Sequence, residues 1–99
     1  MSNSKHLDFK NICWVLSDFL ESYKESEKMD ITHTIKLDAA NGFYDISVKI
    51  NCDTEHNYKY VLPYPAKVVE VYDLLTSIND DIIYLLYSKH IFEFKRSII

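Results

Sequence analysis

A single Asn-Gly pair, Asn41-Gly42, lies between two stretches in which apolar and polar residues strictly alternate. Alternation with a period of two is typical of β-strands that are buried on one face. Asn and Gly tolerate the positive φ angles that both central residues of a type I′ turn require. The sequence therefore predicts a β-hairpin over residues 29–52. Its apolar positions are Met29, Ile31, His33, Ile35 and Leu37, then Tyr44, Ile46, Val48, Ile50 and Cys52.

A two-residue turn also predicts which residues pair, starting from Ala40 opposite Phe43. Every apolar residue then meets an apolar partner, whereas a three-residue loop would shift the register by one and place a polar residue opposite Leu37. One pair is unfavourable, because Asp38 lies opposite Asp45. The predicted apolar pairs are Leu37 with Ile46, Ile35 with Val48, and His33 with Ile50.

The segments on either side of the hairpin predict a helix before it and a strand after it. Residues 1–6 are a polar lead-in with little to hold it, and residues 7–24 have apolar side chains at helical spacing. Tyr58, Tyr60 and Leu62 alternate with Lys59 and Val61, which predicts a third strand. Pro63 and Pro65 end this strand because proline cannot donate a hydrogen bond to a sheet. The apolar residues of the helix are Phe9, Ile12, Cys13, Leu16, Phe19, Leu20 and Tyr23.

The last third of the chain is harder to assign. Pro65 suits the first position of a helix over residues 65–77. Asn79 as N-cap, with basic residues near position 89, favours a short helix over residues 82–88, but six consecutive apolar residues at 82–87 fit a strand as well. Phe92 and Phe94 alternate with charged residues and predict a final strand over residues 90–95. The stripe of the helix over 65–77 is Val68, Val71, Tyr72 and Leu75.

These elements predict one α+β domain over residues 1–99. An N-terminal helix packs on a three-stranded antiparallel β-meander, and one or two helices and a C-terminal strand follow.

Charge and composition exclude several function classes. The net charge is -4 and the acidic residues are scattered, which argues against binding to nucleic acid or an anionic membrane. One glycine in 99 residues cannot build a Gly-rich phosphate loop, so we expect no cofactor. No apolar run is long enough to span a membrane, and no leader sequence is apparent, so the expected location is the cytoplasm.

Two other features of the composition concern the redox state of the cysteines and the kind of genome that encodes the protein. Cys13 and Cys52 are best explained as reduced thiols, with a single disulfide as the alternative. Ten lysines against one arginine, with abundant isoleucine, suggest an AT-rich genome such as that of a low-GC bacterium, a phage or another virus. A viral protein of this kind would act in the cytoplasm of the host cell.

Cys52 and His56 form the one constellation that could carry chemistry, either as metal ligands or as a nucleophile and its base. A structural zinc site needs four ligands, and a cysteine nucleophile needs oxyanion donors that small-residue turns commonly supply. An ordinary polar loop is therefore the favoured interpretation. His33 lies on the apolar face of its strand and is interpreted as a core histidine held by hydrogen bonds.

Aromatic residues are the other unusual feature: eight tyrosines, five phenylalanines and one tryptophan. On a helical wheel Trp14 points about 200° away from Ile12, so either another part of the fold or a partner must cover it. If the strand with Tyr58 and Tyr60, followed by Tyr64, is a sheet edge, its backbone could pair with another chain.

The sequence predicts a small non-catalytic protein-binding module, an inhibitor or immunity-type protein whose acidic, aromatic surface binds another protein through Trp14, Tyr58, Tyr60 and Tyr64. The first alternative is a homodimeric chaperone or assembly factor, because the order of helix, three strands and helix is similar to that of small acidic secretion chaperones, in element order alone. The second alternative is a thiol- or metal-dependent enzyme that uses Cys52 and His56.

Overall fold

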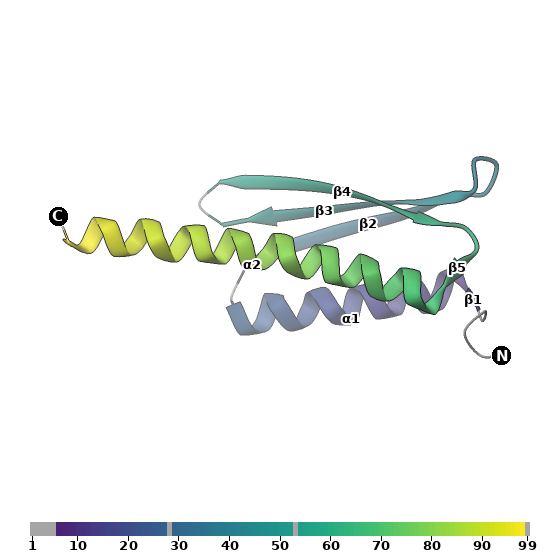
Figure 1. Ribbon diagram of the computed structural model, residues 1–99, viewed down its shortest axis with the longest axis horizontal. Coiled ribbons are helices and arrows are strands. Elements are labelled where there is room, and N and C mark those ends of the chain that lie inside the picture. The colour runs from purple at the N-terminus through teal and green to yellow at the C-terminus, as the bar shows by residue number, and fades with distance from the viewer. Residues whose placement is uncertain (1–5, 28, 53, 99) are drawn as a thin grey trace.

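The protein has an α+β fold in which two helices cover one face of an antiparallel sheet (Figure 1). The computed structural model describes residues 6–27, 29–52 and 54–98, with side chains described as far as Ser88. The larger sheet has the strand order β2-β3-β4, and β1 pairs with β5 in a small second sheet. The predicted meander and the helix before it are confirmed. The elements are β1 (His6–Leu7), α1 (Phe9–Glu27), β2 (Asp30–Asp38), β3 (Phe43–Asn51), β4 (Glu55–Pro63), β5 (Ala66–Lys67) and α2 (Val68–Ile98).

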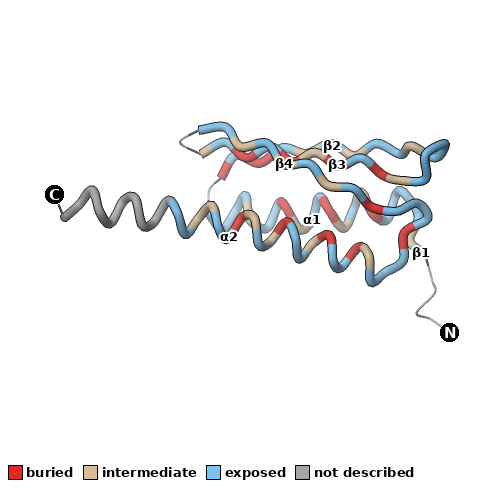
Figure 2. Tube along the Cα trace, turned by 45° about the horizontal axis from the view of Figure 1, so that its top comes forward, coloured by how far each residue is buried: buried red, intermediate tan, exposed pale blue. Residues whose placement is uncertain are grey.

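The hydrophobic core lies between the sheet and the two helices (Figure 2). Alternate residues of β3 face this core, and every third or fourth residue of each helix does the same. Burying each of these side chains stabilises the fold by about 1.5–3 kcal/mol relative to leaving it exposed. The buried residues include Ile12, Leu16 and Leu20 of α1, Tyr44, Ile46, Val48 and Ile50 of β3, and Val71, Leu74, Ile78 and Ile82 of α2.

The register of the first hairpin differs from the prediction by two residues. Asp38 pairs with Phe43, so the loop contains the four residues 39–42 and the type I′ prediction is wrong. A shift of two residues keeps every side chain on its predicted face of the sheet, so the hydrophobic pattern could not reveal the error. The observed apolar pairs are Leu37 with Tyr44, Ile35 with Ile46, and His33 with Val48.

Asp38 explains why the longer loop forms. Its carbonyl oxygen accepts hydrogen bonds from the backbone N–H groups of Asn41 (3.2 Å) and Gly42 (2.9 Å). Its carboxylate also accepts from the Asn41 side-chain amide at 2.8 Å. Gly42 has a φ of 77°, a backbone conformation that glycine adopts at little cost. The resulting register places Lys36 opposite Asp45 and removes the unfavourable Asp38–Asp45 pair.

The start of β4 and the segment before α1 also differ from the prediction. Pro63 ends β4 as expected, but β4 begins at Glu55, three residues before the predicted start. His6 and Leu7 pair with Lys67 and Ala66, so His6 is held in a strand and is not part of a free lead-in. Two-residue strands are too short to leave a periodic signal. Residues 1–5 of the predicted lead-in lie outside the described residues.

One helix, α2, replaces two predicted helices and a predicted strand. It begins at Val68 and not at Pro65, and the Lys67 backbone N–H donates to the Glu70 carboxylate at 2.9 Å across its first turn. Asn79 is not an N-cap, because it lies inside α2, where its side-chain oxygen accepts a hydrogen bond from the Tyr23 hydroxyl. Residues 82–88 are helical, as favoured, but the strand predicted over residues 90–95 is wrong. No glycine or proline follows Pro65 to end the helix.

The buried stripe of α2 is only partly the predicted one. Val71 and Leu75 lie on the inner side, whereas Val68 and Tyr72 are exposed. The α1 and α2 helices run in the same direction (Figure 1). Because Tyr23 contacts Asn79, the end of α1 at Glu27 lies level with about residue 83 of α2. The remainder of α2 continues past α1 towards the C-terminus.

Candidate binding surfaces

Cys52 and His56 do not form a bonded pair in this structure. The Cys52 thiol donates to the Thr54 carbonyl oxygen at 3.8 Å, and the His56 Nε2 atom lies 3.0 Å from the Thr54 hydroxyl. Both side chains therefore have their polar contacts with Thr54. Among the described residues no three His, Cys, Asp or Glu side chains cluster in a way that could hold a metal ion. Cys13 and Cys52 do not form a disulfide with each other, and burial raises the pKa of Cys13.

His33 has a structural contact, as the interpretation of it as a core histidine expects. It is half-buried on the face of β2 that α1 covers. Its Nε2 atom lies 3.2 Å from the Ser17 hydroxyl of α1. This contact joins the helix to the edge of the sheet.

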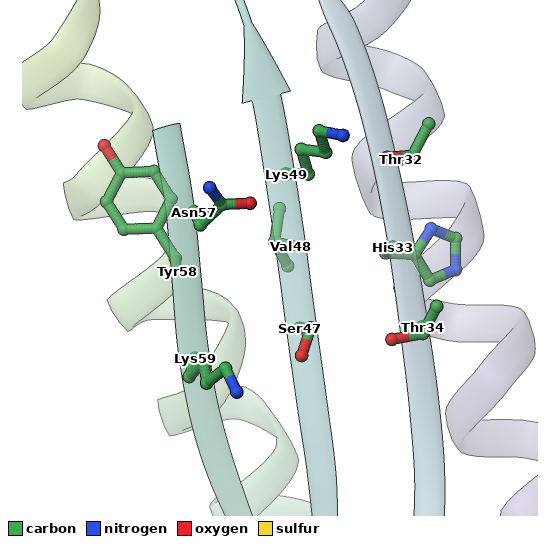
Figure 3. Close-up of a pocket in the computed structure, with 9 residues that line it drawn as sticks. All are labelled: Thr32, His33, Thr34, Ser47, Val48, Lys49, Asn57, Tyr58 and Lys59. Carbon is green, nitrogen blue, oxygen red and sulfur yellow. The ribbon is translucent and has the colours of Figure 1, made fainter. Parts of the chain in front are cut away.

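The face of the sheet that the helices leave uncovered holds a shallow depression of about 300 Å³ lined by residues of all three strands (Figure 3). Thr34, Ser47 and Lys59 form one cross-strand row of it. Lys49 forms an ion pair with Glu55 at 3.2 Å, and hydrogen bonds from Asn57 and Lys49 lower the pKa of Glu55. The depression offers hydroxyl and ammonium donors but no nucleophile beside a base. Sequence reasoning missed it, although its residues occupy the polar positions of the alternating pattern.

Trp14 is the most exposed of the predicted contact residues, with 70% of its side chain accessible. It lies about 160° around the helix axis from the buried Leu16, on the outer side of α1. Asp18 and Glu21 follow one and two turns later on the same side. These residues and Ser17 line a shallow depression of about 240 Å³, called here the Trp14 face. No described part of the fold covers the indole.

The structure places Tyr58 and Tyr60 on the covered side of β4, facing α2. The Tyr60 hydroxyl donates to the Asp81 carboxylate at 2.6 Å. Burial and this hydrogen bond raise the pKa of Tyr60 above its usual range. Burial and the nearby Asp81 also raise the pKa of Tyr58. Both tyrosines therefore join the sheet to α2.

Tyr64 lies just beyond β4 and is partly exposed. Its ring packs edge-on against the buried Tyr44, with the ring centres 5.6 Å apart. The strand before it, β4, is an edge of the sheet, as is β2. Of the four residues proposed to contact a partner, the structure brings Tyr58 and Tyr60 together and leaves Trp14 on a different element.

Exposed apolar residues on α2 are the feature that sequence reasoning missed. Ile83, Tyr84 and Tyr87 have 51%, 74% and 64% of their side chains accessible. The signal was present in the uninterrupted apolar run at 82–87, since a helix cannot bury consecutive residues on one face.

Comparison with known protein families, with curated proteins and with solved structures finds no match to this chain. Within the described residues, no helix combines the length and the apolar character needed to cross a membrane.

Proposed function

We propose that this protein is a non-catalytic protein-binding module that recognises a basic segment of another protein through the Trp14 face. The observation that carries the proposal is the exposure of Trp14 beside two carboxylates on the outer side of α1. Tryptophan is strongly enriched among residues that dominate binding energies at protein interfaces. A large aromatic ring that the described residues leave mostly exposed is therefore a suitable anchor for a partner.

Two of the charged neighbours of Trp14, Asp18 and Glu21, favour a basic partner, whereas the exposed Lys10 one turn before Trp14 opposes one. The face of an indole ring attracts lysine and arginine side chains, by about 0.5–1 kcal/mol at an exposed site and about 2 kcal/mol when water is excluded. Asp18 and Glu21 can each pair with a further basic group on the same segment. The net charge of -4 would accelerate the approach of such a partner. An acidic module that occupies a basic surface of another protein acts as an inhibitor or immunity-type protein.

The experiment is a selection of peptides from a random displayed library on the immobilised full chain. We expect the enriched peptides to be rich in lysine and arginine. Their affinity should fall at least tenfold for Trp14→Ala, which is about 1.4 kcal/mol or more. Asp18→Lys should weaken binding further as the salt concentration is lowered, because it replaces an attraction with a repulsion.

Val61→Ala is the matched control, because Val61 is an apolar residue of similar exposure, 67%, on the uncovered face of the sheet. This variant should bind the selected peptides as the wild type does. Peptides that bind Trp14→Ala as tightly as the wild type, or a selection dominated by acidic peptides, would show that the Trp14 face is not the binding site.

A further inference from the structure

The outer side of α2 carries a line of exposed residues at the spacing of a coiled-coil seam, and Asp73 and Asp80 lie in this line between its uncharged members. Val69, Thr76 and Ile83 are seven residues apart, and Tyr87 follows Ile83 by one turn. All four are exposed, as are Tyr72 and Tyr84 beside the line. The six residues Val69, Tyr72, Thr76, Ile83, Tyr84 and Tyr87 are called here the outer stripe of α2.

The C-terminal part of α2 has less support than the rest of the helix. Past residue 83 it runs beyond the end of α1, and the ribbon also continues beyond the sheet (Figure 1). An isolated helix of about 15 residues is only marginally stable in water, so packing must contribute most of its stability. A helix that is apolar on more than one side requires cover on more than one side.

We propose that the outer stripe of α2 packs against the same stripe of a second copy of this chain, with the two helices antiparallel. The contact is centred between Ile83 and Tyr87, so that Ile83 of each copy lies opposite Tyr87 of the other. In this arrangement the extended end of each α2 lies along the exposed N-terminal half of the other α2. One contact therefore covers both uncovered regions of the helix.

The charges along α2 favour antiparallel pairing with a second copy of the chain. Residues 68–81 contain Glu70, Asp73, Asp80 and Asp81 and no lysine or arginine. Residues 89–98 contain Lys89, Lys95 and Arg96 with one acidic residue, Glu93. Antiparallel pairing places the acidic half of each helix beside the basic end of the other. Parallel pairing would place like charges side by side at both ends.

The outer stripe is large enough for a stable contact. Each copy contributes three exposed tyrosines, and a tyrosine can bury roughly 150 Å². Six tyrosines would bury roughly 900 Å² before the aliphatic residues are counted, close to the roughly 1,000 Å² that a specific interface requires. The twofold symmetry of such a pair is the commonest arrangement among homo-oligomers. The dimer uses α2 and leaves the Trp14 face of α1 free, so it is independent of the proposed function.

The first test is the molar mass of the full chain in solution, measured by light scattering over a range of concentrations. We expect twice the mass of the chain for the wild type and the mass of one chain for Ile83→Asp. Tyr87→Lys is a second disrupting variant. Val61→Asp is the matched control, because Val61 is at least as exposed as Ile83, at 67% against 51%, but lies on the uncovered face of the sheet. A monomeric wild type, a dimeric Ile83→Asp, or a monomeric Val61→Asp overturns the proposal.

The second test is the orientation of the helices, measured from the distance between spin labels at Thr76→Cys in a chain without its native cysteines. Antiparallel pairing separates the two labels by about 27 Å along the axes, since 18 residues at 1.5 Å each lie between them. Parallel pairing would bring them to roughly 10 Å. The longer distance supports the proposal, and the shorter one overturns it.

Discussion

The helices α1 and α2 pack on the same face of the sheet but differ in what they expose. The outer side of α1 is polar and carries both lysines and acidic residues, with Trp14 as its single large apolar residue. The outer side of α2 exposes Tyr72, Ile83, Tyr84 and Tyr87. One apolar stripe is enough for a helix in a two-layer fold, and α1 has one. The proposed contact with a second copy would cover the second apolar side of α2.

Truncation of two neighbouring isoleucines of α2 should give the largest difference in the free energy of unfolding. Ile82 is fully buried and Ile83 is half exposed, at 0% and 51% accessibility. In dilute protein we expect Ile82→Ala to lower the free energy of unfolding by about 2–4 kcal/mol, because it leaves a cavity in the core. Ile83→Ala should change it by less than about 0.5 kcal/mol. Urea unfolding measures both changes. Equal losses would contradict the assignment of Ile82 to a buried side of α2 and Ile83 to an exposed side.

Loss of the contact between Tyr60 and Asp81 should have the next largest effect. This hydrogen bond joins β4 to α2. Among the described residues, no bond between a tyrosine and a carboxylate joins the sheet to α1. Tyr60→Phe should cost about 1 kcal/mol in urea unfolding at neutral pH. A variant as stable as the wild type would show that packing alone holds α2 on the sheet.

The same tyrosine predicts how stability depends on pH. Burial, followed by the hydrogen bond to Asp81, raises the pKa of Tyr60 in the folded protein, whereas an unfolded tyrosine titrates near pH 10. Below that pH the phenol is protonated in both states and its contribution is complete. Above it the unfolded chain loses the proton first, so stability falls as the pH rises. Between about pH 9 and about pH 11, the free energy of unfolding should fall less steeply with pH for Tyr60→Phe than for the wild type.

The N-termini of α1 and α2 are capped differently, and this should have a smaller effect on stability. The Asp8 carboxylate accepts a hydrogen bond from the Asn11 N–H at 2.8 Å, so Asp8 is the N-cap of α1. Glu70 caps α2 from within the helix. Asp8→Ala should cost about 1 kcal/mol, and Glu70→Ala about half as much. Thermal unfolding followed by circular dichroism measures both, and the reverse order would contradict these assignments.

Trp14→Ala should have the smallest effect on folding. A side chain that is 70% exposed contributes little packing, so the free energy of unfolding should change by no more than about 0.5 kcal/mol. The measurement is urea unfolding followed by circular dichroism, since the variant has no tryptophan. A loss of 2 kcal/mol or more, a value typical of core truncation, would mean that the fold itself covers the indole.

The comparison of the helices also shows which parts of the fold could be predicted from the sequence. The apolar residues of α1 keep one helical period throughout, so its prediction lies within a few residues of the structure. In α2 the run at 82–87 has no period, and Phe92 and Phe94 happen to alternate with charged residues. Local patterns therefore divided a continuous helix into pieces. The first part of α2 is held by contacts with α1 and β4, through Asn79 and Asp81, that no local pattern records.

The hairpin shows a second limit. Alternation fixed which side chains face the core, but it could not distinguish two registers that differ by two residues. The choice depends on the hydrogen bonds of Asp38 with Asn41 and Gly42. For the candidate site, the helical wheel placed Trp14 away from the apolar stripe of α1. It could not place Tyr58 and Tyr60, because the face of β4 that is covered depends on where α2 packs.

The most direct test of the central claim, that Trp14 on α1 stays open to a partner, is acrylamide quenching of fluorescence from the single tryptophan. We predict that quenching equals that of a solvent-exposed tryptophan in a short peptide, at concentrations where the chain is dimeric as well as in dilute protein. Strong protection of Trp14 at either concentration would contradict the claim, because the fold or the second copy would then occupy the proposed binding face.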